Sequence, residues 1–228
     1  EIMAKAGFDW LAVDLEHTSL GLRDAIDLVR VIDLCGVAPL VRLSANDSVL
    51  IKRLMDGGAQ GIIVPMVNTA SEARMAVAAC RYPPAGHRGV GLSRAQTFGE
   101  TFDDYFAHNN ERAVVIVQIE HQIAVRNVAD ILAVDGVDAL LIGPYDLSAS
   151  MDIPGQFDHP KLKENVARVI EAAQRVGKPA GFHAVSSDIA PSKAHLASGV
   201  RLLAYSVDMV VLNETFRVGL AALRAAVV

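Results

Sequence analysis

The chain alternates short apolar runs with amphipathic segments along its length, and this alternation restricts the fold more than any other feature. Seven runs have the composition of buried strands, over residues 10–16, 38–43, 61–67, 114–120, 139–144, 179–184 and 202–207. The segments between them place apolar side chains at helical spacing, as in 20–34 and 158–177. Strands that alternate with helices form right-handed β-α units around a parallel sheet, and continuous apolar strands require cover on both faces.

These repeated units predict an α/β fold of the (β/α)8 TIM-barrel type. Seven visible strands are one short of the eight in such a barrel. Residues 1–6 read as the last turn of a helix closed by Gly7, so we expect the first strand to lie outside this numbering. A length of 228 residues suits one barrel domain over 1–228. A doubly wound open sheet is the alternative, but no GxGxxG turn follows the first strand.

Local signals predict where several helices begin. Thr69 and Glu72 match a capping box, and Asn46 or Asp47 can cap a helix that ends at 57–58. Asn213 is expected to cap the last helix. The longest connection, 85–112, is predicted to contain a short helix near 101–109, and connections of this length usually serve function.

Composition excludes several classes of function. The net charge is −5 and no basic stripe is present, which argues against nucleic acid as a partner. No apolar run approaches the roughly 18 residues of a membrane span, and no signal-peptide pattern appears. The two cysteines, Cys35 and Cys80, lie in helix-like segments, which indicates a reducing compartment and a cytoplasmic location.

Polar residues gather where the predicted strands end, and in a barrel all of these ends meet at one rim. Taken singly, each has an ordinary explanation as a cap, a turn residue or an ion-pair partner. As a set they are harder to explain structurally, because a barrel needs no such cluster at one end. The set comprises Asp14, Glu16, His17, Arg42, Gln118, Glu120, Tyr145, Asp146, His183 and Asp208.

Two of these carboxylates suggest a metal. Gln118 and Glu120 are two apart and project to the same face of a strand, while Asp146 ends the next apolar run. Carboxylates at one rim of a parallel sheet can hold a hard divalent cation through oxygen ligands, and we expect these two to do so. Asp56 lies in the last turn of its helix, where the dipole disfavours an anion; it is either solvated or the partner of a rim histidine.

Nearly the whole chain resembles the HpcH/HpaI aldolases, which are class II, metal-dependent pyruvate aldolases. The resemblance covers 6–17, 41–42, 52–60, 64–67, 81–91, 118–120 and 143–148. It implies reversible aldol cleavage of a 4-hydroxy-2-oxo acid, either a 2-keto-3-deoxy sugar acid or a hydroxy-oxo-diacid, to pyruvate and an aldehyde through an enolate held by the metal. It also implies Mg²⁺ or Mn²⁺, with Co²⁺ possible, and a homo-oligomer, a trimer or hexamer with an exchanged helix.

The resemblance also implies roles for single residues. His17 resembles the general base, working with Asp14, and Asp56 the group that raises its basicity. Arg42 resembles the residue that binds substrate and stabilises the developing oxyanion. Glu120 and Asp146 resemble the metal ligands. Gln118, Asp146 and the backbone around Tyr145 resemble substrate contacts.

Three departures from the family leave the acceptor aldehyde open. Tyr145 and the pair Tyr205-Ser206 stand where small residues are usual, and Phe182-His183 where aliphatic residues are common. A Schiff-base aldolase is excluded, because no lysine ends a predicted strand. An oxaloacetate decarboxylase or CoA-ester lyase on the same scaffold stays open, as does a non-catalytic barrel that acts as a binding module.

Overall fold

The computed structural model describes residues 1–226, and its centre is one parallel sheet of seven strands. The strands follow one another in space in the order of the sequence, and each pairs in parallel with the next. The α/β class and the seven parallel strands expected from the sequence are therefore confirmed. The strands are β1 (Trp10–Asp14), β2 (Ala38–Arg42), β3 (Gly61–Val64), β4 (Val114–Ile119), β5 (Ala139–Ile142), β6 (Ala180–Ala184) and β7 (Leu202–Tyr205).

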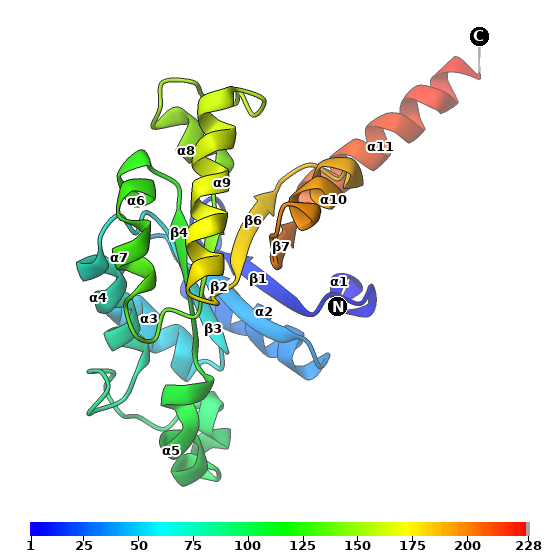
Figure 1. Cartoon of the computed structure of the whole chain (residues 1–228). Helices are drawn as coiled ribbons and strands as arrows, with labels where there is room; N and C mark the ends of the chain where they lie inside the picture. The colour runs from blue at the N-terminus through cyan, green and yellow to red at the C-terminus, as the bar shows by residue number, and fades with distance from the viewer. Residues whose placement is uncertain (227–228) are drawn as a thin grey trace.

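Helices connect the strands and cover the outer face of the sheet, as Figure 1 shows. The α-helices are α1 (Ile2–Lys5), α2 (Leu22–Leu34), α3 (Ser48–Asp56), α4 (Ala70–Cys80), α5 (Phe102–Arg112), α6 (Gln122–Arg126), α7 (Val128–Leu132), α8 (Pro144–Ala149), α9 (Pro160–Arg175), α10 (Ile189–Ala197) and α11 (Asp208–Ala225). A 3-10 segment, η1 (Arg94–Gly99), lies in the long connection before α5. None of the helices described is long and apolar enough to cross a membrane.

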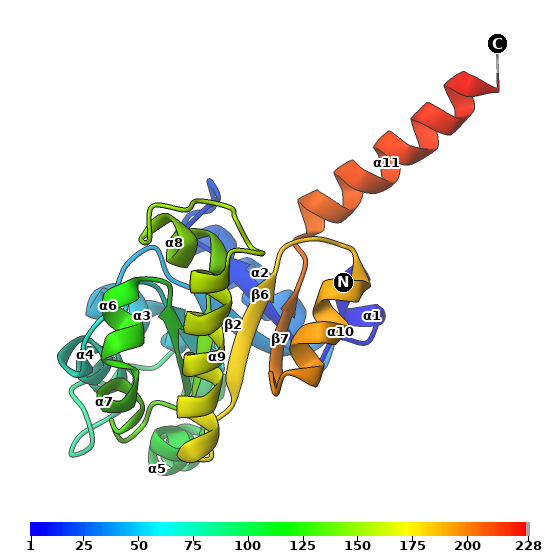
Figure 2. The ribbon, with the colours of Figure 1, turned by 45° about the horizontal axis from the view of Figure 1, so that its top comes forward.

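The sheet curls into a half-barrel and does not close on itself (Figures 1 and 2). Within residues 1–226, β7 and β1 form the two edges and do not pair with each other. A complete eight-stranded barrel is thus not seen.

The two faces of the curled sheet bury different clusters. The outer face packs against the helices in the large core, which includes Val41, Ile62 and Val117. The inner face holds a smaller cluster, formed by Leu40, Ile63, Ile116, Ala139 and Leu141. Because side chains alternate along a strand, residues an even number of positions from these also face the interior. Arg42 and Gln118 are among them, and His183 of β6 is the register partner of Ala204 on β7, which packs against the same cluster.

Two of the predicted helix starts are confirmed and one is wrong. Thr69 and Glu72 form the capping box at the start of α4, and the Asp47 carboxylate caps α3. The last helix begins at Asp208, five residues before the expected cap Asn213, which lies inside it. The fifth strand also ends earlier than predicted, because Pro144 occupies the first turn of α8, where its fixed φ suits a helix.

Helix α11 extends away from the half-barrel (Figure 2). It buries none of its residues within the chain, although much of its surface is apolar. The large hydrophobic side chains that it exposes are Met209, Val211, Leu212, Phe216, Val218, Leu220 and Leu223. This surface has no partner among the residues that the structure describes.

Candidate active site

An ion pair between Asp14 and Arg42 lies at the carboxyl ends of β1 and β2. The two residues are register partners on adjacent strands. Arg42 donates from Nε to Asp14 Oδ1 at 2.8 Å and from Nη2 to Oδ2 at 2.6 Å, a bidentate pair. Burial raises the pKa of Asp14, but the hydrogen bonds from Arg42 and the backbone outweigh it, and the pKa lies below its usual value. Both groups are therefore charged, and the guanidinium plane is fixed.

Glu16 approaches the same guanidinium from the other side. Its Oε2 lies 3.4 Å from Arg42 Nη1, and this buried oxygen has no hydrogen-bond partner in the part of the chain that the structure describes. Burial raises the pKa of Glu16, although the charge of Arg42 acts in the opposite direction. Arg42 thus holds two carboxylates, one by a tight bidentate pair and one loosely.

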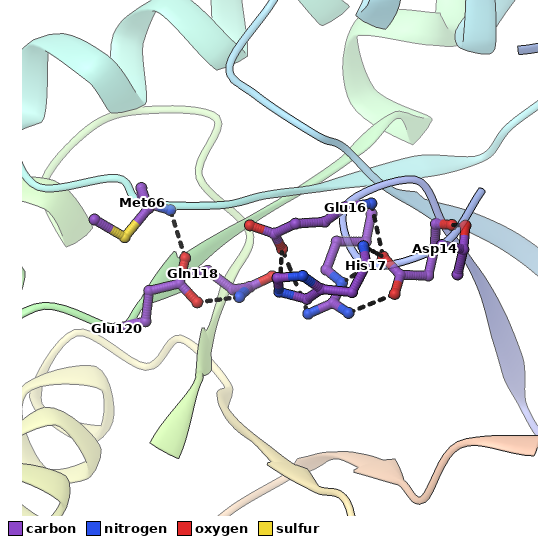
Figure 3. A network of polar contacts seen from close by, with 8 residues as sticks. Asp14, Glu16, His17, Met66, Gln118 and Glu120 are labelled. Atoms are coloured by element: carbon purple, nitrogen blue, oxygen red, sulfur yellow. Dashed lines mark hydrogen bonds and ion pairs between the residues drawn. The ribbon is translucent and has the colours of Figure 1, made fainter. Parts of the chain in front are cut away.

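The His17 ring lies at the open side of this group, with most of its side chain exposed. Its Nε2 is 3.9 Å from Glu16 Oε2, while Asp14 accepts only from the backbone N–H of His17, at 3.5 Å. Figure 3 shows the ring beside the Glu16 carboxylate. Asp14 therefore orients the turn that carries His17, and the carboxylate nearest to the ring is that of Glu16.

Glu120 is the most buried carboxylate at this rim. Its Oε1 accepts a hydrogen bond from the Met66 backbone N–H at 2.7 Å, and its Oε2 accepts one from Gln118 Nε2 (Figure 3). The contact with Gln118 confirms that these two side chains share a face. Burial raises the pKa of Glu120 to about 7, and the nearby charges of Glu16 and Asp146 act in the same direction. An ionised Glu120 therefore needs positive charge beside it.

Because Gly143 has no side chain, the Glu120 side chain can lie directly against its backbone. A Cβ atom at position 143 would lie 2.6 Å from Glu120 Oε2 and 3.1 Å from its Cβ. Asp146 follows in the first turn of α8, exposed, and close enough for its charge to raise the pKa of both Glu120 and Glu16. The structure thus brings the two predicted metal ligands to the same side of the rim.

The oxygen atoms at this rim fit a hard divalent cation. Glu120 and Asp146 supply carboxylate oxygens, and Gln118 Oε1 is a buried acceptor without a hydrogen-bond partner in residues 1–226. In the described chain, no cluster of three or more His, Cys, Asp or Glu has the arrangement of a metal site. Such a cation would therefore have two protein carboxylates, with its other positions left for water and substrate.

Asp56 does not lie with the other predicted site residues within one chain. It ends α3, which runs antiparallel to the strands, and its Oδ1 accepts from Arg88 Nη2 at 2.6 Å. Arg88 Nη1 also donates to Tyr105 and Asn109 of α5. Figure 1 shows α5 and α8 at opposite ends of the molecule. The expected contact between Asp56 and His17 is not formed in this chain, because Asp56 pairs with Arg88.

Three candidates remain, and they differ in their surroundings. Asp208 is exposed in the first turn of α11. Tyr145, expected to lie among the substrate contacts, is exposed and packs edge-on against Phe157, with ring centroids 4.7 Å apart. His183 lies on β6 with its side chain partly buried. Arg42, Asp14 and His17 all lie close enough to affect the pKa of His183.

Sequence reasoning gave no specific role to three parts of this site. Glu16 was one of several rim carboxylates, but its contacts with Arg42 and His17 depend on the fold. The Met66 N–H reaches Glu120 because Met66 adopts a φ of 53°, which is unusual for a side chain of this kind. Gly143 carried a possible signal, since a glycine before Pro144 at a strand end indicates close approach of another group.

Comparisons with known proteins identify the family to which this chain is similar. The profile of the HpcH/HpaI aldolase/citrate lyase family matches residues 1–214. A 2-keto-3-deoxy-L-rhamnonate aldolase of Salmonella gallinarum is 40% identical over 216 residues, which are 94% of this chain and 80% of that protein. A hydroxypyruvate/pyruvate aldolase of Roseobacter denitrificans is 39% identical over 217 residues, 94% of this chain and 84% of that one.

A solved structure supports the same relationship. An HpcH/HpaI aldolase/citrate lyase family protein from Burkholderia cenocepacia superposes with a TM-score of 0.93 at 36% identity, over 98% of this chain and 88% of that one. The fold, the sequence profile and the aldolase relatives all point to one group of proteins. The chain belongs to the HpcH/HpaI aldolase/citrate lyase family.

Proposed function

We propose that this enzyme cleaves a 4-hydroxy-2-oxo acid reversibly to pyruvate and an aldehyde, with a divalent cation at Glu120 and Asp146. The observation that carries the proposal is the excess of buried negative charge at the rim. One cation, Arg42, faces Asp14, Glu16 and Glu120, and burial holds the pKa of Glu120 at about 7. Aldolase relatives at about 40% identity over 94% of the chain support the pyruvate-aldolase class.

Glu120 and Asp146 would hold the metal, with Gln118 beside them. When bound, the cation acts as a Lewis acid toward the oxygens of a 2-oxo acid and lowers the cost of enolate formation. Mg²⁺ and Mn²⁺ suit two carboxylates completed by water and substrate oxygens, and Co²⁺ can take similar sites. The buried Gln118 Oε1, which has no partner in residues 1–226, is free to accept from a water or a substrate hydroxyl in this position.

Arg42 would stabilise the negative charge that develops on the substrate, and His17 would accept the proton of its 4-hydroxyl group. Arg42 presents a guanidinium that Asp14 fixes through two hydrogen bonds, so its positive charge needs no reorientation when an oxyanion develops nearby. His17 is exposed to the open side, where a substrate enters, and can accept the proton of the 4-hydroxyl group. The Glu16 carboxylate lies 3.9 Å from the Nε2 atom of this ring.

A coupled assay tests this function directly. Pyruvate released from 4-hydroxy-2-oxo acids is reduced by lactate dehydrogenase, and the loss of NADH is followed with and without added Mg²⁺ or Mn²⁺. We expect metal-dependent release that EDTA abolishes and added metal restores. Full activity after removal of metal would exclude the class II mechanism. The assay should span sugar-acid and diacid substrates.

We also propose that the enzyme is a homo-oligomer, a trimer or hexamer, in which α11 packs against a neighbouring copy. The supporting observation is the apolar surface of α11, where Phe216 and Leu223 are 65% and 66% exposed. Light scattering after size-exclusion chromatography gives the mass of the assembly. Phe216→Asp should shift it toward the monomer, while Arg217→Ala on the same helix serves as the matched control. A monomeric wild-type protein would contradict the proposal.

A further inference from the structure

His183 is a titratable group at the site that the proposed mechanism does not use. Its neighbour Phe182 points outward and stacks on His195 of α10, with ring centroids 3.6 Å apart. Side chains alternate along a strand, so His183 points into the half-barrel. Its register partner on β7 is the small Ala204, which packs against the inner cluster. The imidazole therefore enters the interior at the carboxyl end of β6, toward the proposed substrate.

The surroundings of His183 define what the ring can offer. Burial lowers its pKa to about 4, and the positive charge of Arg42 acts in the same direction. The ring is therefore neutral at pH 7, with one N–H donor and one acceptor nitrogen. Its nitrogens make no hydrogen bond within residues 1–226, which leaves both available to a ligand.

The charges at the rim limit which chemical groups of a substrate can bind beside His183. In the described chain, Arg42 is the one lysine or arginine that ends a strand, and Asp14 already binds it through both carboxylate oxygens. Glu16 adds a second negative charge beside it. A carboxylate on the aldehyde portion of the substrate would meet a strand-end cation that two carboxylates already hold. A hydroxyl group, in contrast, can both donate to and accept from a neutral imidazole.

We infer that His183 is a specificity-determining residue whose imidazole binds a hydroxyl group of the acceptor aldehyde. The enzyme should therefore prefer α-hydroxyaldehydes, and hence 2-keto-3-deoxy sugar acids, over substrates whose aldehyde portion is plain or carries a carboxylate. This inference rests on the proposed aldolase function. It adds the substrate class to that function and assigns the residue that selects it.

A matched pair of aldehydes tests the inference. Lactaldehyde and propanal differ by one hydroxyl group, so the ratio of their kcat/KM values in addition of pyruvate reports contacts to that group alone. We expect the wild-type enzyme to favour lactaldehyde and His183→Leu to lower the ratio by about tenfold, the size of one hydrogen bond between neutral groups. His183→Asn, which keeps a donor and an acceptor, should retain part of the preference and covers the case in which the leucine variant does not fold.

The control is His195→Leu, which makes the same chemical change in α10, where the ring stacks on Phe182, and should leave the ratio unchanged. An unaltered ratio in both His183 variants would overturn the inference while the aldolase function stands. Exchange of the pyruvate methyl protons with deuterated water, measured by NMR in the wild-type protein, reports enolate formation without any aldehyde. Absence of that exchange would overturn the proposed function, and the role of His183 with it.

Discussion

The two ends of the half-barrel both bury charge, but they balance it differently. At the end opposite the rim, Arg88 pairs with Asp56, and Tyr105 and Asn109 accept its remaining Nη1 hydrogens. Tyr82 packs against the same guanidinium, 4.7 Å from its ring centroid. One cation there meets one carboxylate. At the rim, one cation, Arg42, faces several carboxylates. One of their buried oxygens, Glu16 Oε2, has no hydrogen-bond partner in the described chain.

The two networks differ in how far their charges are balanced within the chain. The Arg88 cluster is balanced within the chain and ties the long connection and α5 to α3. The rim is left with excess negative charge and free acceptors, which is the state expected of a site that a cation and a substrate complete. Burial of a charged group is thus common to both ends, and Arg88 Nε also has no hydrogen-bond partner in the described chain, whereas the excess of negative charge is specific to the rim.

Glu120→Gln should give the largest effect. The amide keeps the shape and can accept from the Met66 N–H, but it removes the charge that would bind the cation. We expect the rate of metal-dependent pyruvate release to fall by about 10³-fold or more, since Lewis-acid stabilisation is worth several kcal/mol. The melting temperature of the metal-free protein should not fall, because a buried charge has been removed. Retained activity would show that the rim does not work through Glu120.

Arg88→Met should act on stability. The change leaves the Asp56 carboxylate, 21% exposed, without its partner. We expect the free energy of unfolding to drop by about 3 kcal/mol, as for other broken buried pairs. Urea denaturation measures it. The double variant with Asp56→Asn should lose less than the sum of the two single changes. Additive losses would mean that the two groups do not interact.

Arg42→Lys tests the rim from its positive side. Lysine keeps the charge but cannot make the bidentate pair with Asp14, so the charge is no longer fixed. We expect kcat for pyruvate release to fall by about 10²-fold. The change in unfolding free energy should be smaller than for Arg88→Met, which urea denaturation of both variants compares. A kcat equal to that of the wild type would remove Arg42 from the mechanism.

The pH dependence of stability should give the smallest effect. Because the pKa of Glu120 in the folded protein is raised to about 7, folding favours its protonated form. The metal-free protein should therefore lose stability as pH rises from about 4.5 through about 7. Thermal unfolding in EDTA across this range measures the slope. Glu120→Gln should flatten the slope, and an equal slope in both proteins would assign it to other groups.

The sequence predicted the fold well where a local signal exists. The alternation of strands and helices, the Asp47 cap and the Thr69–Glu72 capping box are all found as expected. The start of α11 was missed because the helix has no buried face, so its apolar pattern does not mark where it begins. Asp146 was predicted to end a strand, but it lies in the first turn of α8. Pro144, two residues before it, is a helix-start signal.

The candidate site was predictable as a set of residues but not as a set of contacts. Strand ends are readable from the sequence, and this placed Asp14, Arg42 and Glu120 at one rim. Pairings between distant segments are not readable in the same way. Arg88 binds Asp56 from 32 residues away, and the sequence contains no sign that this pairing would hold Asp56 at the other end. The raised pKa of Glu120 likewise follows from burial that only the folded chain creates.

Direct measurement of Mn²⁺ binding tests the central claim. Free Mn²⁺ gives an electron paramagnetic resonance signal that disappears on binding, so titration of the metal-free protein yields the stoichiometry and the affinity. We expect one site per chain that is lost in Glu120→Gln and in Asp146→Asn. The Asp104→Asn variant, which lacks a carboxylate of α5 at the opposite end of the molecule, should keep this metal site. Binding of equal strength in the wild type and the two rim variants would contradict it.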